Sequence, residues 1–79
     1  MAVTFVVEQA GCEACASRVR GALEQLGKVA SVEIDEEADA ATVRAAGPLS
    51  EAAVGEALRV ASSGSGHAYR VRPGSWQSA

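Results

Sequence analysis

Apolar and polar positions alternate or recur at helical spacing over most of the first half of the chain. Residues 3–8 alternate, which predicts a strand with Val3, Phe5 and Val7 on its buried face. After a loop at residues 9–13, the spacing over residues 14–26 predicts a helix whose apolar stripe comprises Ala16, Val19, Ala22, Leu23 and Leu26. Residues 29–35 and 40–46 alternate on either side of a charged turn at residues 36–39. They predict two strands with inward positions at Ala30, Val32, Ile34, Ala41, Val43 and Ala45.

The second half predicts one more helix and one more strand. Gly47 and Pro48 interrupt the pattern, and Ser50 is suited to cap a helix that ends near Ser62. Its apolar face comprises Leu49, Val54, Ala57, Leu58 and Ala61. A Ser/Gly loop at residues 62–66 leads to a short strand over residues 68–72, with Tyr69 and Val71 inward. Residues 73–79 show no period, so we expect residues 1–72 to form one domain and residues 73–79 a flexible C-terminal tail, with Trp76 exposed or folded back on the sheet.

The element order is strand, helix, strand, strand, helix, strand. Right-handed crossovers fold this order into an α+β protein of the ferredoxin-like βαββαβ class: a four-stranded antiparallel sheet with both helices on one face. Strand and helix directions alternate in this topology. We therefore expect the loop at residues 9–13, the charged turn at residues 36–39 and the loop that ends at His67 to lie at the same end of the molecule.

Composition narrows the class of protein. The chain has 79 residues, a formal charge of −3 and scattered basic residues, so it offers no basic stripe for nucleic acid. No apolar run approaches the roughly 20 residues that span a bilayer, and no cleavable leader precedes Val3. We expect a soluble, cytoplasmic protein without membrane insertion.

Cys12 and Cys15 are the only cysteines, and two residues separate them at the predicted strand-to-helix turn. A helix N-terminus favours thiolates, and we expect the first-turn amides to lower the pKa of at least Cys15. We also expect both sulfurs to be open to solvent. Two thiolates suit a soft ion such as Cu(I), whereas two cysteines and one histidine make a four-ligand zinc site only if carboxylates complete it. Thiol redox chemistry is the alternative.

These features resemble the heavy-metal-associated domain family, which includes small copper chaperones and modules of metal-pumping P-type ATPases. The resemblance covers residues 3–72 and depends on the element order and on the Cys-x-x-Cys at the first strand-to-helix turn. The family loop is Gly-Met-x-Cys-x-x-Cys, and Gln9 and Ala10 replace its Gly and Met. Zinc-pumping relatives tend to carry an acidic residue where Gly11 stands, which favours copper here.

The resemblance implies one Cu(I) bound by Cys12 and Cys15, and transfer of that ion to the metal-binding domain of a copper-transporting P-type ATPase. The cyanobacterial chaperones carry a histidine in the loop before the fourth strand, which implies that His67 approaches the metal. The protein would then be a non-enzymatic chaperone, a monomer or a metal-bridged dimer. The alternatives are a thiol-disulfide oxidoreductase and a mercury- or zinc-binding module of a detoxification system.

Overall fold

The computed structural model of the protein describes residues 2–46, 49–64 and 66–78. The elements follow one another as β1 (Ala2–Glu8), α1 (Glu13–Glu24), β2 (Lys28–Asp35), β3 (Ala40–Ala46), α2 (Glu51–Ser62), β4 (Arg70–Val71) and β5 (Gln77–Ser78). The predicted interruption at Gly47 and Pro48 lies outside the described residues, as does Ser65 of the predicted Ser/Gly loop. The element order through β4 is the predicted one.

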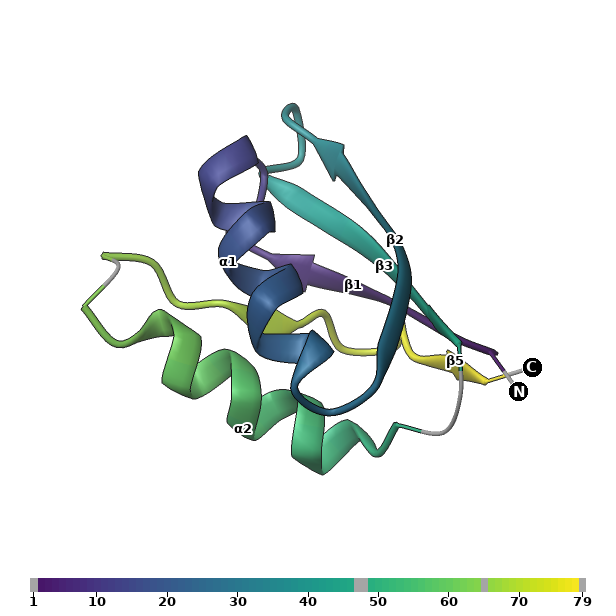
Figure 1. Ribbon diagram of the computed structural model, residues 1–79. Helices are drawn as coiled ribbons and strands as arrows, with labels where there is room; N and C mark the ends of the chain where they lie inside the picture. Colours follow the sequence, from purple (N-terminus) through teal and green to yellow (C-terminus); the bar gives the residue numbers. More distant parts are fainter. Residues whose placement is uncertain (1, 47–48, 65, 79) are drawn as a thin grey trace.

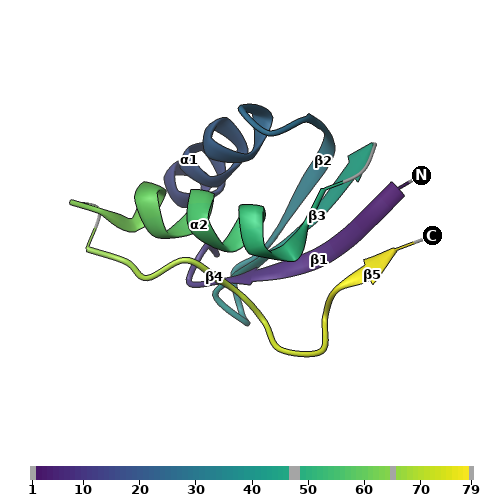
Figure 2. The ribbon, with the colours of Figure 1, turned by 90° about the horizontal axis from the view of Figure 1, so that it is seen from below.

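The strands form one antiparallel sheet in the order β2-β3-β1-β4. Both helices cover the same face of this sheet, and the other face is open (Figures 1 and 2). The predicted α+β, ferredoxin-like class is therefore confirmed. Buried apolar residues alternate with more exposed ones along the central strands β1 and β3. Each of these strands has a neighbouring strand on both sides, so its whole inner face contributes to the core.

The core lies between the inner face of the sheet and the two helices. Val3, Phe5 and Val7 of β1 are buried as predicted, and they pack with buried residues of the other elements: Val19, Leu23, Val29, Ala41, Val43, Val54, Leu58 and Tyr69. Ser50 caps α2 as predicted, since its hydroxyl oxygen accepts a hydrogen bond of 3.1 Å from the amide of Ala53. Within the described ranges, neither helix is long and apolar enough to cross a membrane.

Strand β2 departs from the predicted alternation. A β-bulge between Val29 and Ser31 leaves Ala30 without a partner on β3, so Val29 is buried and Ala30 is exposed. The prediction of Ala30 as an inward residue is therefore wrong. Ile34 is on the inner face of this edge strand but remains 40% exposed.

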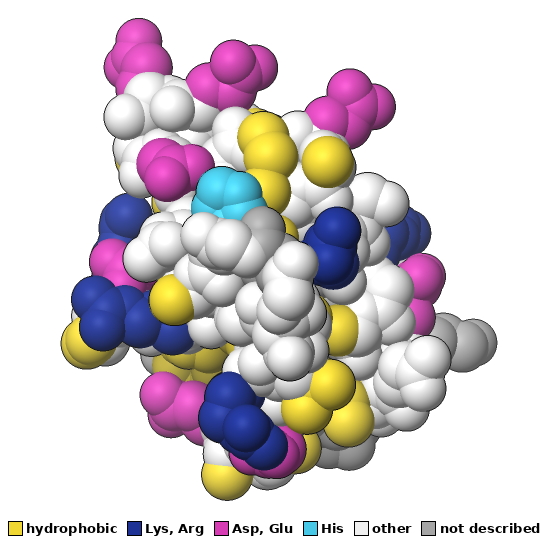
Figure 3. Space-filling view, turned by 90° about the vertical axis from the view of Figure 1, so that its left-hand side faces the viewer, with side chains coloured by type: hydrophobic (Ala, Val, Ile, Leu, Met, Phe, Trp, Pro, Cys, Tyr) yellow, Lys and Arg dark blue, Asp and Glu magenta, His cyan; other side chains and the backbone are white. Residues whose placement is uncertain are grey.

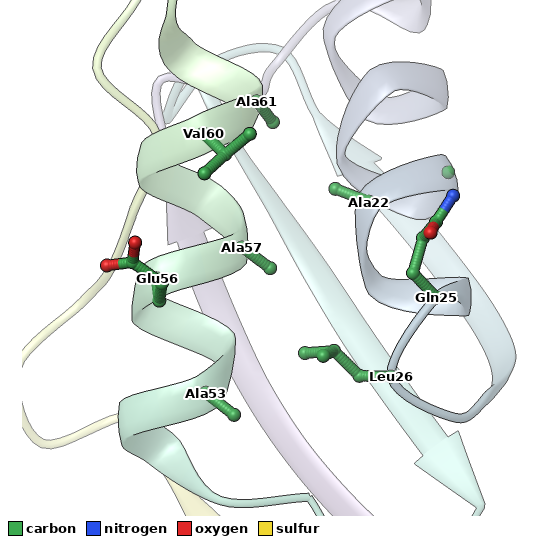
Figure 4. Close-up of a pocket in the computed structure, with 9 residues that line it drawn as sticks. Ala22, Gln25, Leu26, Ala53, Glu56, Ala57, Val60 and Ala61 are labelled. Atoms are coloured by element: carbon green, nitrogen blue, oxygen red, sulfur yellow. The ribbon is translucent and has the colours of Figure 1, made fainter.

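Leu26 also departs from the prediction, because α1 ends at Glu24 and Leu26 is 41% exposed. Figure 4 shows its side chain directed toward α2, in an apolar groove of about 590 Å³ between the helices. Ala53 and Ala57 face it from α2. Leu26 therefore lines the outer surface of the helix pair rather than the core.

The expectation that the tail has no regular structure is wrong at its end, where β5 pairs with Val3 and Thr4 of β1. β4 is only two residues long and pairs with Val7 and Glu8, so it leaves the first half of the same edge of β1 open. The tail returns along that edge. The ring of Trp76 stacks on the ring of Phe5, with centroids 4.9 Å apart. The division into a domain of residues 1–72 and a tail of residues 73–79 stays a prediction.

Ser75 bridges the gap between β4 and β5. Its hydroxyl oxygen accepts a hydrogen bond of 3.1 Å from the amide of Val6 and donates one of 2.7 Å to the carbonyl of Arg72. The Arg72 amide in turn donates to the Val6 carbonyl. The interruption between the two short strands thus leaves the backbone of Val6 paired.

Candidate metal centre

Both cysteines lie where β1 gives way to α1, and Cys12 is the last residue of a segment that we call the thiol loop (residues 9–12). Cys12 is the N-cap residue of α1, and its sulfur accepts a hydrogen bond of 3.3 Å from the amide of Cys15, as a serine oxygen does at many helix starts. Cys15 follows in the first turn of α1. The helix start therefore brings the two sulfurs together, and their Sγ atoms are 2.7 Å apart.

The two thiols differ in exposure. Cys12 is exposed, whereas Cys15 is only 5% exposed and belongs to the core cluster. The expectation that both sulfurs are open to solvent is thus met by Cys12 alone. Since the Cys12 sulfur lies directly against that of Cys15, movement of the exposed Cys12 side chain is the simplest way to admit an ion. One ion bound to both sulfurs at metal–sulfur distances near 2.3 Å needs more room than a sulfur–sulfur separation of 2.7 Å, so the sulfurs must separate on binding.

The thiols also differ in acidity, in the direction opposite to the prediction. The hydrogen bond with the Cys15 side chain, followed by those from the amides of Cys15 and Ala14, lowers the pKa of Cys12. The same shared hydrogen bond raises the pKa of Cys15, and a hydrogen bond from the Tyr69 side chain opposes that rise. The prediction failed because the sulfur of the N-cap residue, rather than that of Cys15, receives the first-turn amides.

This order of ionisation predicts the order of alkylation. Reduced protein treated with iodoacetamide across pH, with each cysteine followed by peptide mass spectrometry, should be modified first at Cys12 and below the usual thiol pKa of about 8.5. Cys15→Ala should move the Cys12 midpoint to higher pH, because the side-chain hydrogen bond is lost. Tyr69→Phe, the matched control, should leave Cys12 ahead of Cys15. Faster reaction of Cys15 would contradict the assignment.

The thiol loop is bonded both to the charged turn and to the segment that follows the Ser/Gly loop, so these segments lie at one end of the molecule, as the topology predicts. A carboxylate oxygen of Asp39 accepts a hydrogen bond of 3.2 Å from the amide of Gly11, and the side-chain oxygen of Gln9 accepts one of 3.0 Å from the amide of Ala68. Acidic side chains gather along the upper part of the face shown in Figure 3, which views the molecule from the side on which β1 ends. The Asp39 carboxylate also opposes ionisation of both thiols.

The sequence model of the heavy-metal-associated domain matches residues 4–61, most of the chain. The chain belongs to the heavy-metal-associated domain family. No curated protein matches the sequence. A solved structure described as "Crosstalk between Cu(I) and Zn(II) homeostasis" is similar in fold, with a TM-score of 0.57 and 22% identity over 87% of this chain and 94% of that one. Family membership supports a metal-binding, chaperone-like role.

Two residues of this heavy-metal-associated domain replace the Gly and Met of the family loop. Gln9 has a positive φ of 63°, a conformation that glycine adopts without strain and that costs other residues about 1–2 kcal/mol. The bond to Ala68 gives the Gln9 side chain a fixed partner in this conformation. Ala10 is fully buried in the core cluster, where the family pattern has the larger Met. The Gln9 side chain thus gives the loop an anchor that glycine cannot provide.

His67 does not join the thiols. Within the ranges that the structure covers, no group of three histidine, cysteine or acidic side chains is close enough to hold a metal. His67 is exposed, and its ring stacks on that of Tyr69, with centroids 5.9 Å apart. Tyr69, predicted only as an inward residue, is buried, and its side chain forms a hydrogen bond with Cys15. A ligand role for His67 stays a prediction.

Proposed function

We propose that this domain is a soluble Cu(I) metallochaperone in which Cys12 and Cys15 hold one copper ion as cargo. One observation carries the proposal: an exposed thiol of lowered pKa lies 2.7 Å from a second thiol at the start of α1. Thiolates are the form in which cysteine binds soft metals, and a helix N-terminus stabilises their charge. The pair therefore has both the chemistry and the placement of a metal ligand set.

The donor set favours copper. Soft thiolates select Cu(I), which accepts low coordination numbers, whereas structural zinc takes four ligands. Gly11 also supports this choice, since zinc-pumping relatives tend to carry an acidic residue there. A Cβ at this position would lie 2.4 Å from the Cα of Asp39, so the turn leaves no room for such a side chain. The similar fold described with Cu(I) and Zn(II) homeostasis agrees with a role in handling these metals.

Transfer would proceed by ligand exchange. An incoming thiolate of the partner joins the ion, Cys12 leaves first because it is exposed and outside the core, and Cys15 follows. The natural recipient is the metal-binding domain of a copper-transporting P-type ATPase in the cytoplasm. Exposed acidic residues of the first helical turn and of the charged turn would speed encounter with a basic partner surface: Glu13, Asp35, Glu36, Glu37 and Asp39.

Titration of the reduced protein with Cu(I) against a competing chelator tests the proposal. We expect one equivalent to bind, and Cys12→Ser combined with Cys15→Ser to abolish binding. Ser17→Ala, on the exposed side of the same helix, is the matched control and should bind normally. Stoichiometric binding by the double variant would remove the proposal. Gel filtration of the loaded protein distinguishes a monomer from a metal-bridged dimer, and competition with Zn(II) and Hg(II) tests the detoxification alternative.

Thiol-disulfide exchange is the second candidate. An exposed cysteine of lowered pKa followed by a buried cysteine of raised pKa is also suited to attack on a disulfide by Cys12 and release of the mixed disulfide by Cys15. Turnover in an insulin reduction assay, together with indifference to Cu(I), would favour this function over the chaperone.

A further inference from the structure

The turn between β2 and β3 is bonded directly to the thiol loop. A carboxylate oxygen of Asp39 accepts the hydrogen bond from the Gly11 amide, across 28 positions of sequence. Gly11 immediately precedes Cys12, the N-cap residue of α1. The bond therefore acts one residue before the first sulfur.

The backbones of the turn and the loop are also in close contact. A Cβ on Gly11 would lie 2.4 Å from the Cα of Asp39 and 2.8 Å from its carbonyl carbon, and backbone atoms cannot rotate aside as a flexible side chain can. Asp39 itself has a positive φ of 50°, which aspartate and asparagine tolerate better than most residues. Position 39 thus needs both a hydrogen-bond acceptor and a left-handed backbone. Position 11, which faces it, has no room for a side chain.

Cys12 is thereby held from both directions. On its helical side, its sulfur accepts the Cys15 amide and its carbonyl accepts the Ala16 amide at 2.8 Å. On its other side, Gly11 is fixed by Asp39. Without the bond to Asp39, this side of the loop is held only through Gln9 and the buried Ala10, farther from the exposed sulfur.

We infer that Asp39 is a positioning residue for metal binding: through Gly11 it fixes the thiol loop so that the Cys12 sulfur is held beside that of Cys15. This role depends on the proposed function, since it concerns retention of the same ion. Asp39 does not itself bind the ion. It acts on Cys12 through the backbone, as residues behind a metal ligand commonly orient the ligand.

The negative charge of Asp39 must be separated from its hydrogen bond, because the charge opposes thiolate formation while the bond favours the site geometry. Asp39→Asn removes the charge but keeps an acceptor oxygen and tolerance of the left-handed backbone. Asp39→Ala removes the acceptor, and Asp39→Gly removes it while allowing the backbone conformation. The asparagine variant is thus the neutral reference for the other two.

The experiment measures Cu(I) affinity by chelator competition and hydrogen exchange of the Gly11 amide in the metal-free protein. Relative to Asp39→Asn, we expect Asp39→Ala and Asp39→Gly to bind Cu(I) about tenfold more weakly and to exchange the Gly11 proton faster. Gly11→Ala should show the same loss, because its methyl group displaces the turn. Equal affinity of the three Asp39 variants would overturn the inference, and so would unchanged exchange at Gly11.

Failure of the proposed function gives a different result. If the wild-type protein binds no Cu(I), the chaperone proposal fails. The positioning of Cys12 is then decided in the metal-free protein, where Asp39→Ala and Asp39→Gly should alter both the Cys12 alkylation rate and Gly11 exchange relative to Asp39→Asn. Identical values would overturn the inference in this case as well.

Discussion

Phe5→Ala is expected to lower the free energy of unfolding by about 3–5 kcal/mol, which is a large part of the total of about 5–15 kcal/mol typical of a domain. Phe5 is fully buried in the central strand β1, and its ring stacks on Trp76. Its removal takes apolar area from the middle of a small core and leaves a cavity that the sheet backbone cannot close. Denaturant unfolding followed by circular dichroism measures the loss.

Two further variants keep this prediction testable if Phe5→Ala does not fold. Phe5→Leu retains most of the volume and should lose less. Val60→Ala changes a side chain that is 61% exposed on α2 and should remain within about 0.5 kcal/mol of the wild type. A double-mutant cycle between Phe5 and Trp76 should give a coupling of about 0.5–1.5 kcal/mol. A Phe5→Ala loss as small as that of Val60→Ala would contradict the assigned core.

Cys12→Ser and Cys15→Ser are each expected to weaken Cu(I) binding more than loss of a residue that only supports a ligand. Loss of such a supporting residue costs roughly 10- to 100-fold in metal affinity. Each variant removes one of the two thiolates of the proposed site. Chelator competition with each single variant measures the loss. Tight binding by Cys12→Ser or by Cys15→Ser would show that one sulfur is not a ligand.

The same two variants should differ in stability. Serine is a favoured N-cap residue, so Cys12→Ser should leave the unfolding free energy nearly unchanged. Cys15 is buried in the core cluster, and a hydroxyl group there should cost about 1 kcal/mol or more. Cys15→Ala, which adds no polar group, is the control for this second effect. Equal stabilities of the two serine variants would contradict the difference in burial.

The thiol pair could be located from the sequence, but the contacts that support it could not. The Cys-x-x-Cys spacing at a strand-to-helix turn is a local signal, and the structure brings the two sulfurs together there. The contact of Asp39 with Gly11 joins residues 28 positions apart and depends on a left-handed backbone at Asp39, so no local sequence pattern predicts it. The sequence did mark Gln9, which stands where the family pattern has glycine, but it did not show the partner of Gln9, Ala68.

The acidities of the two thiols show the same limit. A helix start was expected to favour ionisation of Cys15, but Cys12 occupies the N-cap and accepts the amides, while Cys15 is partly enclosed by the core and by Tyr69. Shifting the helix start by one residue changes which side chain occupies the N-cap. Sequence periodicity does not locate boundaries that finely.

The sequence by itself determined the order of strands and helices, the inner faces of β1, β3 and α2, and the place of the thiol pair, because periodicity and turn residues act over short stretches of chain. The tertiary structure alone decided the bulge that turns Ala30 outward, the pairing of β5 with β1, and the hydrogen bond between Asp39 and Gly11. Each of these depends on which distant segment is available to satisfy an edge or fill a gap. That choice is made by the packing of the whole fold rather than by any one stretch of residues.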